Sequence, residues 1–236
     1  MNPRCHPCLA ILFGLWIGLS GQPTVVAAQT GSVNAPRAEL QGSGLLAALR
    51  GGGYILYFRH TATFGDQNDE RMTDFSDCAT QRNLTEAGRA EARAIGADLR
   101  ELDIPIGSVL ASPFCRTMET AKLLFGRAAA TPAVRGGPAQ AESPERYAAL
   151  RDLLSKRVAP GTNLAIVSHG NPYRAVVGGA YLGEGEAAVI EPRGTEGFRV
   201  VARIPRDDWK QMGCAGALTS PSTDPARTEP CAPFHH

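Results

Sequence analysis

Short apolar runs alternate with helical patterns along most of the chain. The runs expected to form buried strands are short and are bounded by turn residues, at 54–58, 109–111 and 163–167. Apolar residues at helical spacing predict four helices, which end near residues 102, 125, 157 and 181. The first follows the first strand, the second follows the second strand, and the last two lie before and after the third strand. Strands that alternate with helices predict an α/β fold: a three-layer, doubly wound, mostly parallel sheet with helices on both faces.

Further elements complete this pattern. We expect a short helix at 45–50, a short strand near 133–134, and two last strands at 187–190 and 198–204. Apolar and polar residues alternate in the last strand, which is typical of an edge or half-exposed position. Thr85 is a candidate N-cap for the helix that ends near residue 102.

The first 28 residues have the pattern of a secretion signal. Arg4 precedes an apolar run at 9–19, and Val26-Ala27-Ala28 resembles a small-residue cleavage site. The apolar run is too short to span a bilayer as a mature helix, although an uncleaved anchor is the alternative. We therefore expect cleavage after Ala28 and a periplasmic or secreted protein with no stable membrane anchor.

The rest of the chain is long enough for one domain with a substantial core. We predict a flexible lead-in at 29–44, the domain at 45–206, and a tail at 207–236 that contains proline and cysteine. Loss of residues 1–28 removes one arginine and no acidic residue, so the formal charge of +1 falls to about zero. Without a basic stripe the chain is not expected to bind nucleic acid.

Four cysteines remain after the expected cleavage. An even number in an exported protein suggests two disulfides, for which three connectivities are possible. We favour Cys78 with Cys115, and Cys214 with Cys231, and free thiols are the alternative. The first pair would tie the acidic loop at 62–81, which is long enough to indicate a functional role, to the next strand end.

Cationic and imidazole side chains stand where three predicted strands end. Arg59 and His60 follow the first strand, Arg116 follows the second, and His169 follows the third. Ligands bind at the carboxyl ends of the strands in open parallel sheets, so these four side chains could share one pocket. Two guanidinium groups and two imidazoles suit a tetrahedral dianion, with one imidazole as nucleophile. Each residue alone could equally serve in a structural ion pair or a cap.

In combination these residues resemble the histidine phosphatase superfamily, whose fold is shared with cofactor-dependent phosphoglycerate mutase. The resemblance covers residues 54–204 and includes N-L-T-E-A-G-R at 83–89. It places the nucleophile at His60 beside Arg59, the second arginine at Arg116 in S-P-F-C-R-T-M-E-T-A, and the second histidine at His169 in V-S-H-G. It implies hydrolysis of a phosphate ester through a phosphohistidine, without a metal or another cofactor.

The resemblance also leaves several positions to interpret. Thr61 stands where the family usually has glycine, and its side chain is expected to reshape the pocket slightly. Thr63 occupies a position where many members have Thr or Ser, and its hydroxyl is expected to contact phosphate. Arg82 is a candidate substrate contact, and a surface salt bridge is its alternative.

The leaving alcohol needs a proton, which a carboxylic acid commonly supplies. Glu142 is the preferred donor and Glu145 the second candidate. Both could instead cap or solvate the helix that begins near residue 144, and small members of the family manage without an obvious acid here.

These features together predict an exported phosphomonoesterase that acts on a small phosphorylated molecule such as a sugar phosphate. Export argues against a glycolytic mutase, whose substrates are cytosolic. The alternative is a non-catalytic phosphate or phosphosugar binder on the same scaffold. A cysteine phosphatase is excluded, because the residues six positions after Cys78 and Cys115 are Leu84 and Ala121 rather than arginine. No paired metal-ligand spacing supports a metallohydrolase.

Overall fold

A computed structural model describes residues 40–136 and 144–217, with side chains to residue 213 and Pro144 by its backbone alone. The strands are β1 (Ile55–Arg59), β2 (Ile106–Ala111), β3 (Ala129–Ala130), β4 (Asn163–Ser168), β5 (Ala187–Pro192) and β6 (Phe198–Ile204). The α-helices are α1 (Gly42–Gly51), α2 (Glu86–Glu101), α3 (Cys115–Phe125), α4 (Ala148–Ser155), α5 (Gly170–Val177) and α6 (Trp209–Ala217). The predicted signal segment and most of the predicted tail lie outside the described residues. None of the described helices combines the length and the apolar composition needed to cross a membrane.

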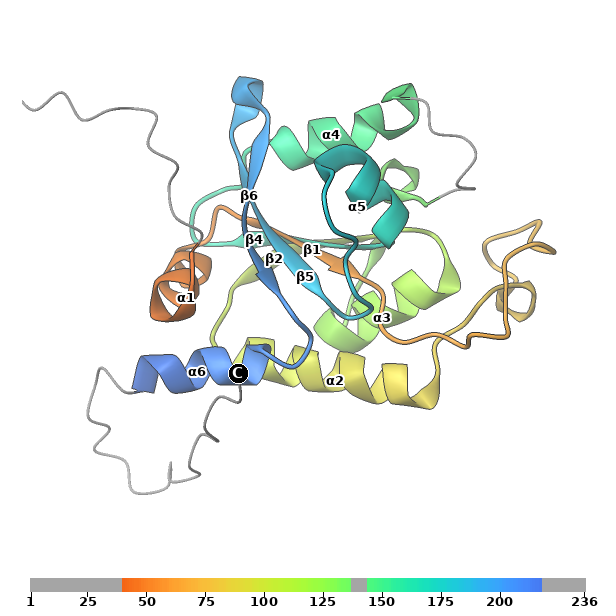
Figure 1. The fold of residues 1–236 in the computed structure, drawn as a ribbon, viewed down its shortest axis with the longest axis horizontal. Helices are drawn as coiled ribbons and strands as arrows, with labels where there is room; N and C mark the ends of the chain where they lie inside the picture. Colours follow the sequence, from red (N-terminus) through yellow and green to blue (C-terminus); the bar gives the residue numbers. More distant parts are fainter. Residues whose placement is uncertain (1–39, 137–143, 218–236) are drawn as a thin grey trace, which may run out of the picture. The chain divides into compact units, whose positions relative to one another are not determined.

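The strands form one mixed sheet in the order β3-β2-β4-β1-β5-β6. Figure 1 shows this sheet with α4 and α5 above it and α2 and α6 below it. Strands β3, β2, β4 and β1 are parallel to their neighbours, whereas β5 runs antiparallel to β1 and β6 antiparallel to β5. The predicted mostly parallel α/β sheet is therefore confirmed. The last strand lies at the edge of the sheet, as its alternating pattern indicates.

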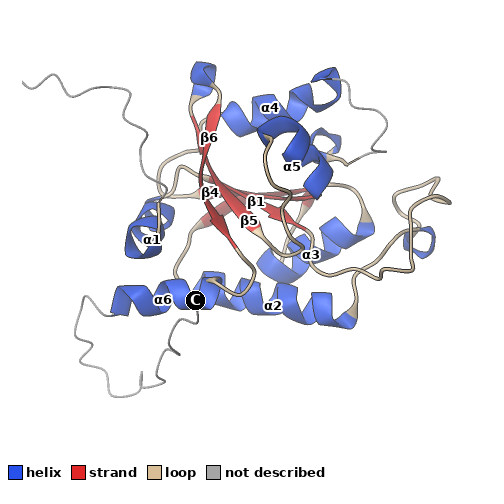
Figure 2. Cartoon of the chain, in the orientation of Figure 1, coloured by secondary structure: helices blue, strands red, loops and turns tan. Residues whose placement is uncertain are grey.

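Helices cover both faces of the sheet (Figure 2). Helices α1, α2, α3 and α6 pack on one face and α4 and α5 on the other. Strand β1 contributes side chains to the hydrophobic cores on both faces of the sheet, because successive side chains of a strand point to opposite faces. Leu56 and Phe58 enter the first core, while Ile55 and Tyr57 enter the second. All four are fully buried, which is why this stretch reads as a continuous apolar run.

Two local predictions differ from the structure. The short strand predicted near 133–134 lies a few residues earlier, as β3. Pro132–Val134 instead forms a 3₁₀ turn that the Thr131 side chain caps. The helix predicted from residue 144 begins as a 3₁₀ turn, Pro144–Tyr147, and α4 continues it only to Ser155. Proline lacks an N–H for a strand ladder, which accounts for the first difference.

The connection between β1 and α2 depends on a close backbone contact. Thr85 caps α2 as predicted, its hydroxyl accepting from Gly88 N at 2.9 Å. Thr85 N in turn donates to Ala62 O at 3.0 Å. A Cβ at Gly88 would overlap the Ala62 backbone, so the glycine lets α2 begin directly beside the residues that follow His60.

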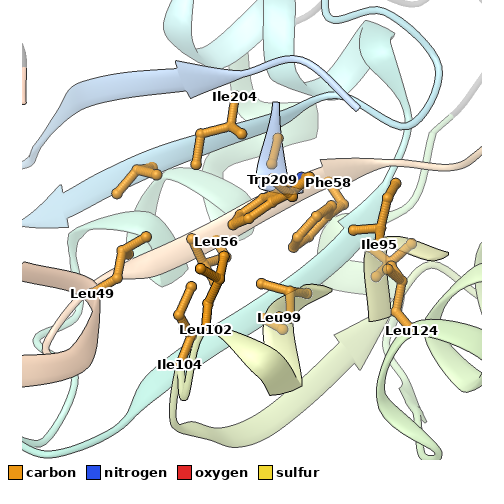
Figure 3. Close-up of a cluster of buried hydrophobic side chains, with 14 of the residues drawn as sticks. Leu49, Leu56, Phe58, Ile95, Leu99, Leu102, Ile104, Leu124, Ile204 and Trp209 are labelled. Carbon is orange, nitrogen blue, oxygen red and sulfur yellow. The ribbon is translucent and has the colours of Figure 1, made fainter. Parts of the chain in front are cut away.

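The larger core extends past the predicted domain end at residue 206. Trp209, the first residue of α6, is fully buried and stacks on Phe58 with ring centroids 5.7 Å apart. Figure 3 shows the indole among leucine and isoleucine side chains of α1, α2 and the sheet. Helix α6 thus closes this face of the sheet, although the sequence of the region is otherwise typical of a tail.

Trp209→Ala is expected to lower the free energy of unfolding by about 3 to 5 kcal/mol, because it removes a large buried ring and leaves a cavity. Lys210→Ala, at an exposed position of the same helix, should change it by no more than about 0.5 kcal/mol. Urea denaturation of both variants measures the difference. Equal effects would show that α6 does not belong to the cooperative core.

Candidate active site

The sheet brings the predicted strand-end residues to one place. Strands β1 and β4 pair in parallel with Arg59 opposite Ser168, so the residues that follow, His60 and His169, leave the sheet side by side. The backbone N–H of His60 donates to Ser168 O at 3.0 Å. The two imidazole rings lie 5.6 Å apart between centroids. Arg116, from the first turn of α3, reaches His169 Nδ1 with its Nη2 at 3.4 Å.

His60 is held in one neutral tautomer. Its Nδ1 lies 2.9 Å from the Thr61 carbonyl oxygen, which can only accept, so Nδ1 carries the proton and Nε2 keeps the lone pair. The side chain is buried, and this burial lowers the pKa of His60 to about 3. The charges of Arg116 and Arg59 act in the same direction. The free site therefore presents an unprotonated Nε2 at any ordinary pH.

His169 is also buried and neutral. Because the Arg116 guanidinium can only donate, His169 Nδ1 accepts, and the proton on Nε2 is donated to Ser112 Oγ at 2.8 Å. Burial is the main reason that the pKa of His169 falls well below its usual value, and Arg116 adds to it. The main chain is fixed as well, since the Tyr57 hydroxyl donates to His169 O at 2.9 Å.

Arg116 is oriented by a carboxylate that the sequence did not single out. Its Nη1 and Nη2 donate to the two oxygens of Asp69 at 2.9 and 3.0 Å, and Nη1 also contacts Arg82 O at 3.2 Å. The side chain is only 6% exposed, and among the described residues its Nε has no hydrogen-bond partner. Asp69 thus occupies the end of the guanidinium, and the Nε–H remains a buried donor without a partner among the described residues.

The acidic loop is fastened to the start of α3. The predicted Cys78–Cys115 disulfide is confirmed, with the two Cα atoms 5.7 Å apart. Cys115 N donates to Gln81 Oε1 at 2.9 Å, and the rings of Phe75 and Phe114 pack edge to face at 5.0 Å. These contacts hold the loop that carries Asp69 against the helix that carries Arg116. The pairing of Cys214 with Cys231 lies outside the described side chains and stays a prediction.

Arg59 lies against the loop between α5 and β5. Its Nη1 donates to Leu182 O at 2.8 Å, and its Nη2 lies 3.4 Å from Glu184 Oε1. The same carboxylate oxygen accepts from the Thr63 hydroxyl at 2.8 Å. Glu184 is thus a second carboxylate of the site that the sequence analysis did not predict. Tyr181 covers Arg59, with its ring centroid 5.4 Å from the guanidinium carbon.

The other predicted residues have different surroundings. Arg82 is half-buried, and its charge lowers the pKa of both histidines. Among the described residues its side chain has no hydrogen-bond or ion-pair partner, so the salt bridge considered as its alternative is not formed there. Glu145 is exposed, and within the described part of the chain no hydrogen bond or ion pair links it to the site. Glu142 lies outside the described residues.

Thr61 packs on α3. Its side chain is fully buried, and its hydroxyl lies 3.3 Å from Thr120 Oγ1. Because Thr120 donates its own proton to Arg116 O at 2.7 Å, Thr61 donates to Thr120. The side chain that replaces the usual glycine therefore connects the end of β1 to the backbone of Arg116.

The arrangement can hold a tetrahedral oxyanion. Arg59, Arg116 and Arg82 surround two neutral imidazoles, and two carboxylates balance part of the positive charge. Within the described residues no cluster of metal-ligating side chains is formed. A local sequence signal for Asp69 existed, since it lies in the long acidic loop, but several other carboxylates lie in the same loop. Glu184 follows a glycine in a short turn and gives no such signal.

Acid should destabilise the fold through the buried histidines. Their pKa values are lowered on folding, so the unfolded chain binds more protons and stability is lost as pH falls below about 6.5. Between pH 8 and pH 5 each neutral buried imidazole should cost about 2 kcal/mol. Urea denaturation at both pH values measures this loss. His60→Asn should lose less over the interval, and an equal loss would contradict a neutral buried His60.

The disulfide should stabilise the fold and the site together. It closes a loop with a sequence separation of 37. Replacing both Cys78 and Cys115 by serine is therefore expected to lower the free energy of unfolding by about 2 to 4 kcal/mol. The loop that carries Asp69 should then be cut more readily by protease than α2 or α3. Unchanged protection of residues 66–82 would show that other contacts suffice to hold the loop.

One family model matches part of the chain. The model of the histidine phosphatase superfamily (branch 1) matches residues 55–137. No curated protein matches the chain. Among solved structures, the protein histidine phosphatase SixA with tungstate has a TM-score of 0.48 at 18% identity, covering 65% of this chain and 97% of its own.

Two other solved structures are similar. A mycobacterial glucosyl-3-phosphoglycerate phosphatase with inorganic phosphate has a TM-score of 0.47 at 16% identity, covering 64% of this chain and 96% of its own. A phosphoserine phosphatase from Entamoeba histolytica has a TM-score of 0.45 at 11% identity, covering 65% and 98%. The segment that matches the family model contains Arg59, His60 and Arg116, and β4 delivers His169 beside them, so the chain resembles the histidine phosphatase superfamily at all four positions.

Proposed function

We propose that this protein is a phosphomonoesterase that transfers the phosphoryl group of its substrate to His60. The observation that carries the proposal is the state of His60, which is neutral, buried and hydrogen-bonded through Nδ1 to the Thr61 carbonyl. Its Nε2 lone pair is therefore available for attack on phosphorus. Arg59 and Arg116 lie close enough for their charges to act on this ring.

In the proposed reaction the guanidinium groups of Arg59, Arg116 and Arg82 neutralise the equatorial oxygens as charge spreads over them. The Thr63 hydroxyl, which donates to Glu184 in the free site, turns its proton to a phosphoryl oxygen on the Arg59 side. His169 donates to a non-bridging oxygen after it gains a proton, because a bound dianion opposes the lowering of its pKa by burial and Arg116. Water then attacks phosphorus and releases His60.

The proton for the leaving alcohol is proposed to come from Glu142. This residue follows the second arginine in the sequence, as the donor does in many members of the family. Its replacement by glutamine should slow the hydrolysis of alkyl phosphates more than that of p-nitrophenyl phosphate, whose leaving group needs little protonation. Equal slowing of both would argue against the role.

We further propose that the protein is exported and acts on a small phosphorylated molecule such as a sugar phosphate. The pattern of residues 1–28 supports export. The Cys78–Cys115 disulfide also supports it, because disulfides persist in oxidising compartments. The mass of the mature N-terminus tests cleavage after Ala28.

Hydrolysis of p-nitrophenyl phosphate by the wild type and by His60→Ala tests the activity. We expect the substitution to lower kcat by at least about 10³-fold, because the covalent route is lost. Acid-quenched wild type should carry one phosphoryl group on His60, detected by mass spectrometry.

The binding alternative predicts a different result. A phosphate binder would retain inorganic phosphate in calorimetry but release no p-nitrophenol above the His60→Ala background between acid and neutral pH. That outcome would replace the phosphatase proposal.

A further inference from the structure

Glu184 contacts three residues of the proposed active site. Its Oε1 accepts from the Thr63 hydroxyl at 2.8 Å, lies 3.4 Å from Arg59 Nη2, and lies 3.9 Å from His60 Nδ1. Among the described residues no other carboxylate lies within ion-pair distance of the His60 ring. It faces the Nδ1 side of the ring, opposite the nitrogen that would attack phosphorus.

The backbone places Glu184 firmly at this position. Gly185 N donates to His60 O at 3.0 Å, and Arg59 N donates to Glu186 O at 3.0 Å. The turn needs Gly185, whose φ of 77° is one that other residues rarely adopt. The two residues that follow Glu184 are therefore hydrogen-bonded to the end of β1, and Leu182, two residues before it, accepts from the Arg59 side chain. The turn that carries the carboxylate is thus held on both sides.

Phosphoryl transfer to His60 places a positive charge on its imidazole ring, which the surroundings of the ring disfavour. When the bond from Nε2 to phosphorus forms, Nδ1 keeps its proton and the imidazole ring becomes positively charged. Burial and the charges of Arg116 and Arg59 already disfavour a positive charge on His60. A carboxylate next to Nδ1 offsets this cost, as a buried aspartate stabilises an imidazolium in serine hydrolases.

We propose that Glu184 is a positioning residue that stabilises the positive charge on His60 during phosphoryl transfer. The proposal rests on the proposed function and concerns the same site. In the first step the Nε2–phosphorus bond forms, and the bond from phosphorus to the leaving oxygen breaks with its electron pair on oxygen, which takes a proton from the general acid unless it leaves as p-nitrophenolate. In the second step water attacks phosphorus, the electron pair returns to Nε2, and the water loses a proton to the conjugate base of that acid or to solvent. Glu184 stays ionised in both steps and transfers no proton.

This role predicts that loss of the Glu184 charge affects the rates of phosphoenzyme formation and breakdown differently. Glu184→Gln keeps the size of the side chain and an acceptor for Thr63 but removes the charge. The rate of phosphoenzyme formation should fall about 10- to 100-fold, because positive charge develops in that step. The rate of phosphoenzyme breakdown should stay equal or rise, because the charge disappears there. Glu184→Asp should recover part of the formation rate.

Glu186→Gln is the matched control. Glu186 lies two residues away in the same loop, and its side chain contacts Gly183 N and Arg203 rather than the proposed active site. Both rates should stay within about twofold of wild type. Single-turnover quench of p-nitrophenyl phosphate measures formation and breakdown separately, and thermal unfolding checks that each variant is folded.

Several outcomes overturn the inference. Equal slowing of formation and breakdown would indicate that Glu184 only supports the loop or acts as a proton-transfer group. A fall in inorganic phosphate affinity that matches the fall in rate would indicate that it only holds Arg59. An unchanged formation rate in Glu184→Gln would exclude the role directly.

Failure of the proposed function can be separated from failure of this inference. If wild type hydrolyses no ester, phosphoramidate can be used to transfer a phosphoryl group to His60, with ammonia as the leaving group. Lower labelling of His60 in Glu184→Gln than in wild type would then still support the inference, and equal labelling would overturn it. No labelling of wild-type His60 would overturn both.

Discussion

The parallel pairing of β1 with β4 is the constraint on which the site depends. It sets Arg59 opposite Ser168 and so brings His60 and His169 out of the sheet as neighbours. The hydrogen bond from His60 N to Ser168 O extends this register by one residue. A shift of one residue would turn one of the histidines to the other face of the sheet, where α4 and α5 or α2 and α3 would cover it.

Burial then gives these histidines their chemical state. Both imidazoles are inside a cationic environment, and desolvation is the largest reason that their pKa values fall. A carbonyl fixes the tautomer of His60, and a guanidinium that can only donate fixes that of His169. Asp69 and Glu184 offset the charges of Arg116 and Arg59. The remaining positive charge of the free site therefore comes mainly from Arg82, which is suited to an incoming anion.

Two structural supports lie outside the residues that would contact substrate. The Cys78–Cys115 disulfide and the Gln81 side chain hold the acidic loop on α3, so that Asp69 meets Arg116. The second support is Thr61, which is hydrogen-bonded to Thr120 of α3, and Thr120 in turn contacts the Arg116 backbone. The two elements that carry His60 and Arg116 are thus linked by a disulfide, hydrogen bonds and packing.

The sequence by itself determined the α/β class and the strand ends with Arg59, His60, Arg116 and His169. These follow from local patterns, because apolar runs, caps and motif spacing are properties of neighbouring residues. For the disulfide it favoured Cys78 with Cys115 but left three connectivities open, and the structure decided the pairing. Only the tertiary structure decided that Asp69 and Glu184 join the site and that Trp209 belongs to the core. Each of these residues makes its contacts with residues far away in the chain. No local pattern distinguishes Asp69 and Glu184 from the other carboxylates, or Trp209 from the other residues of the predicted tail. Side-chain partners across the sheet and its loops are fixed by packing, which the order of residues alone does not display.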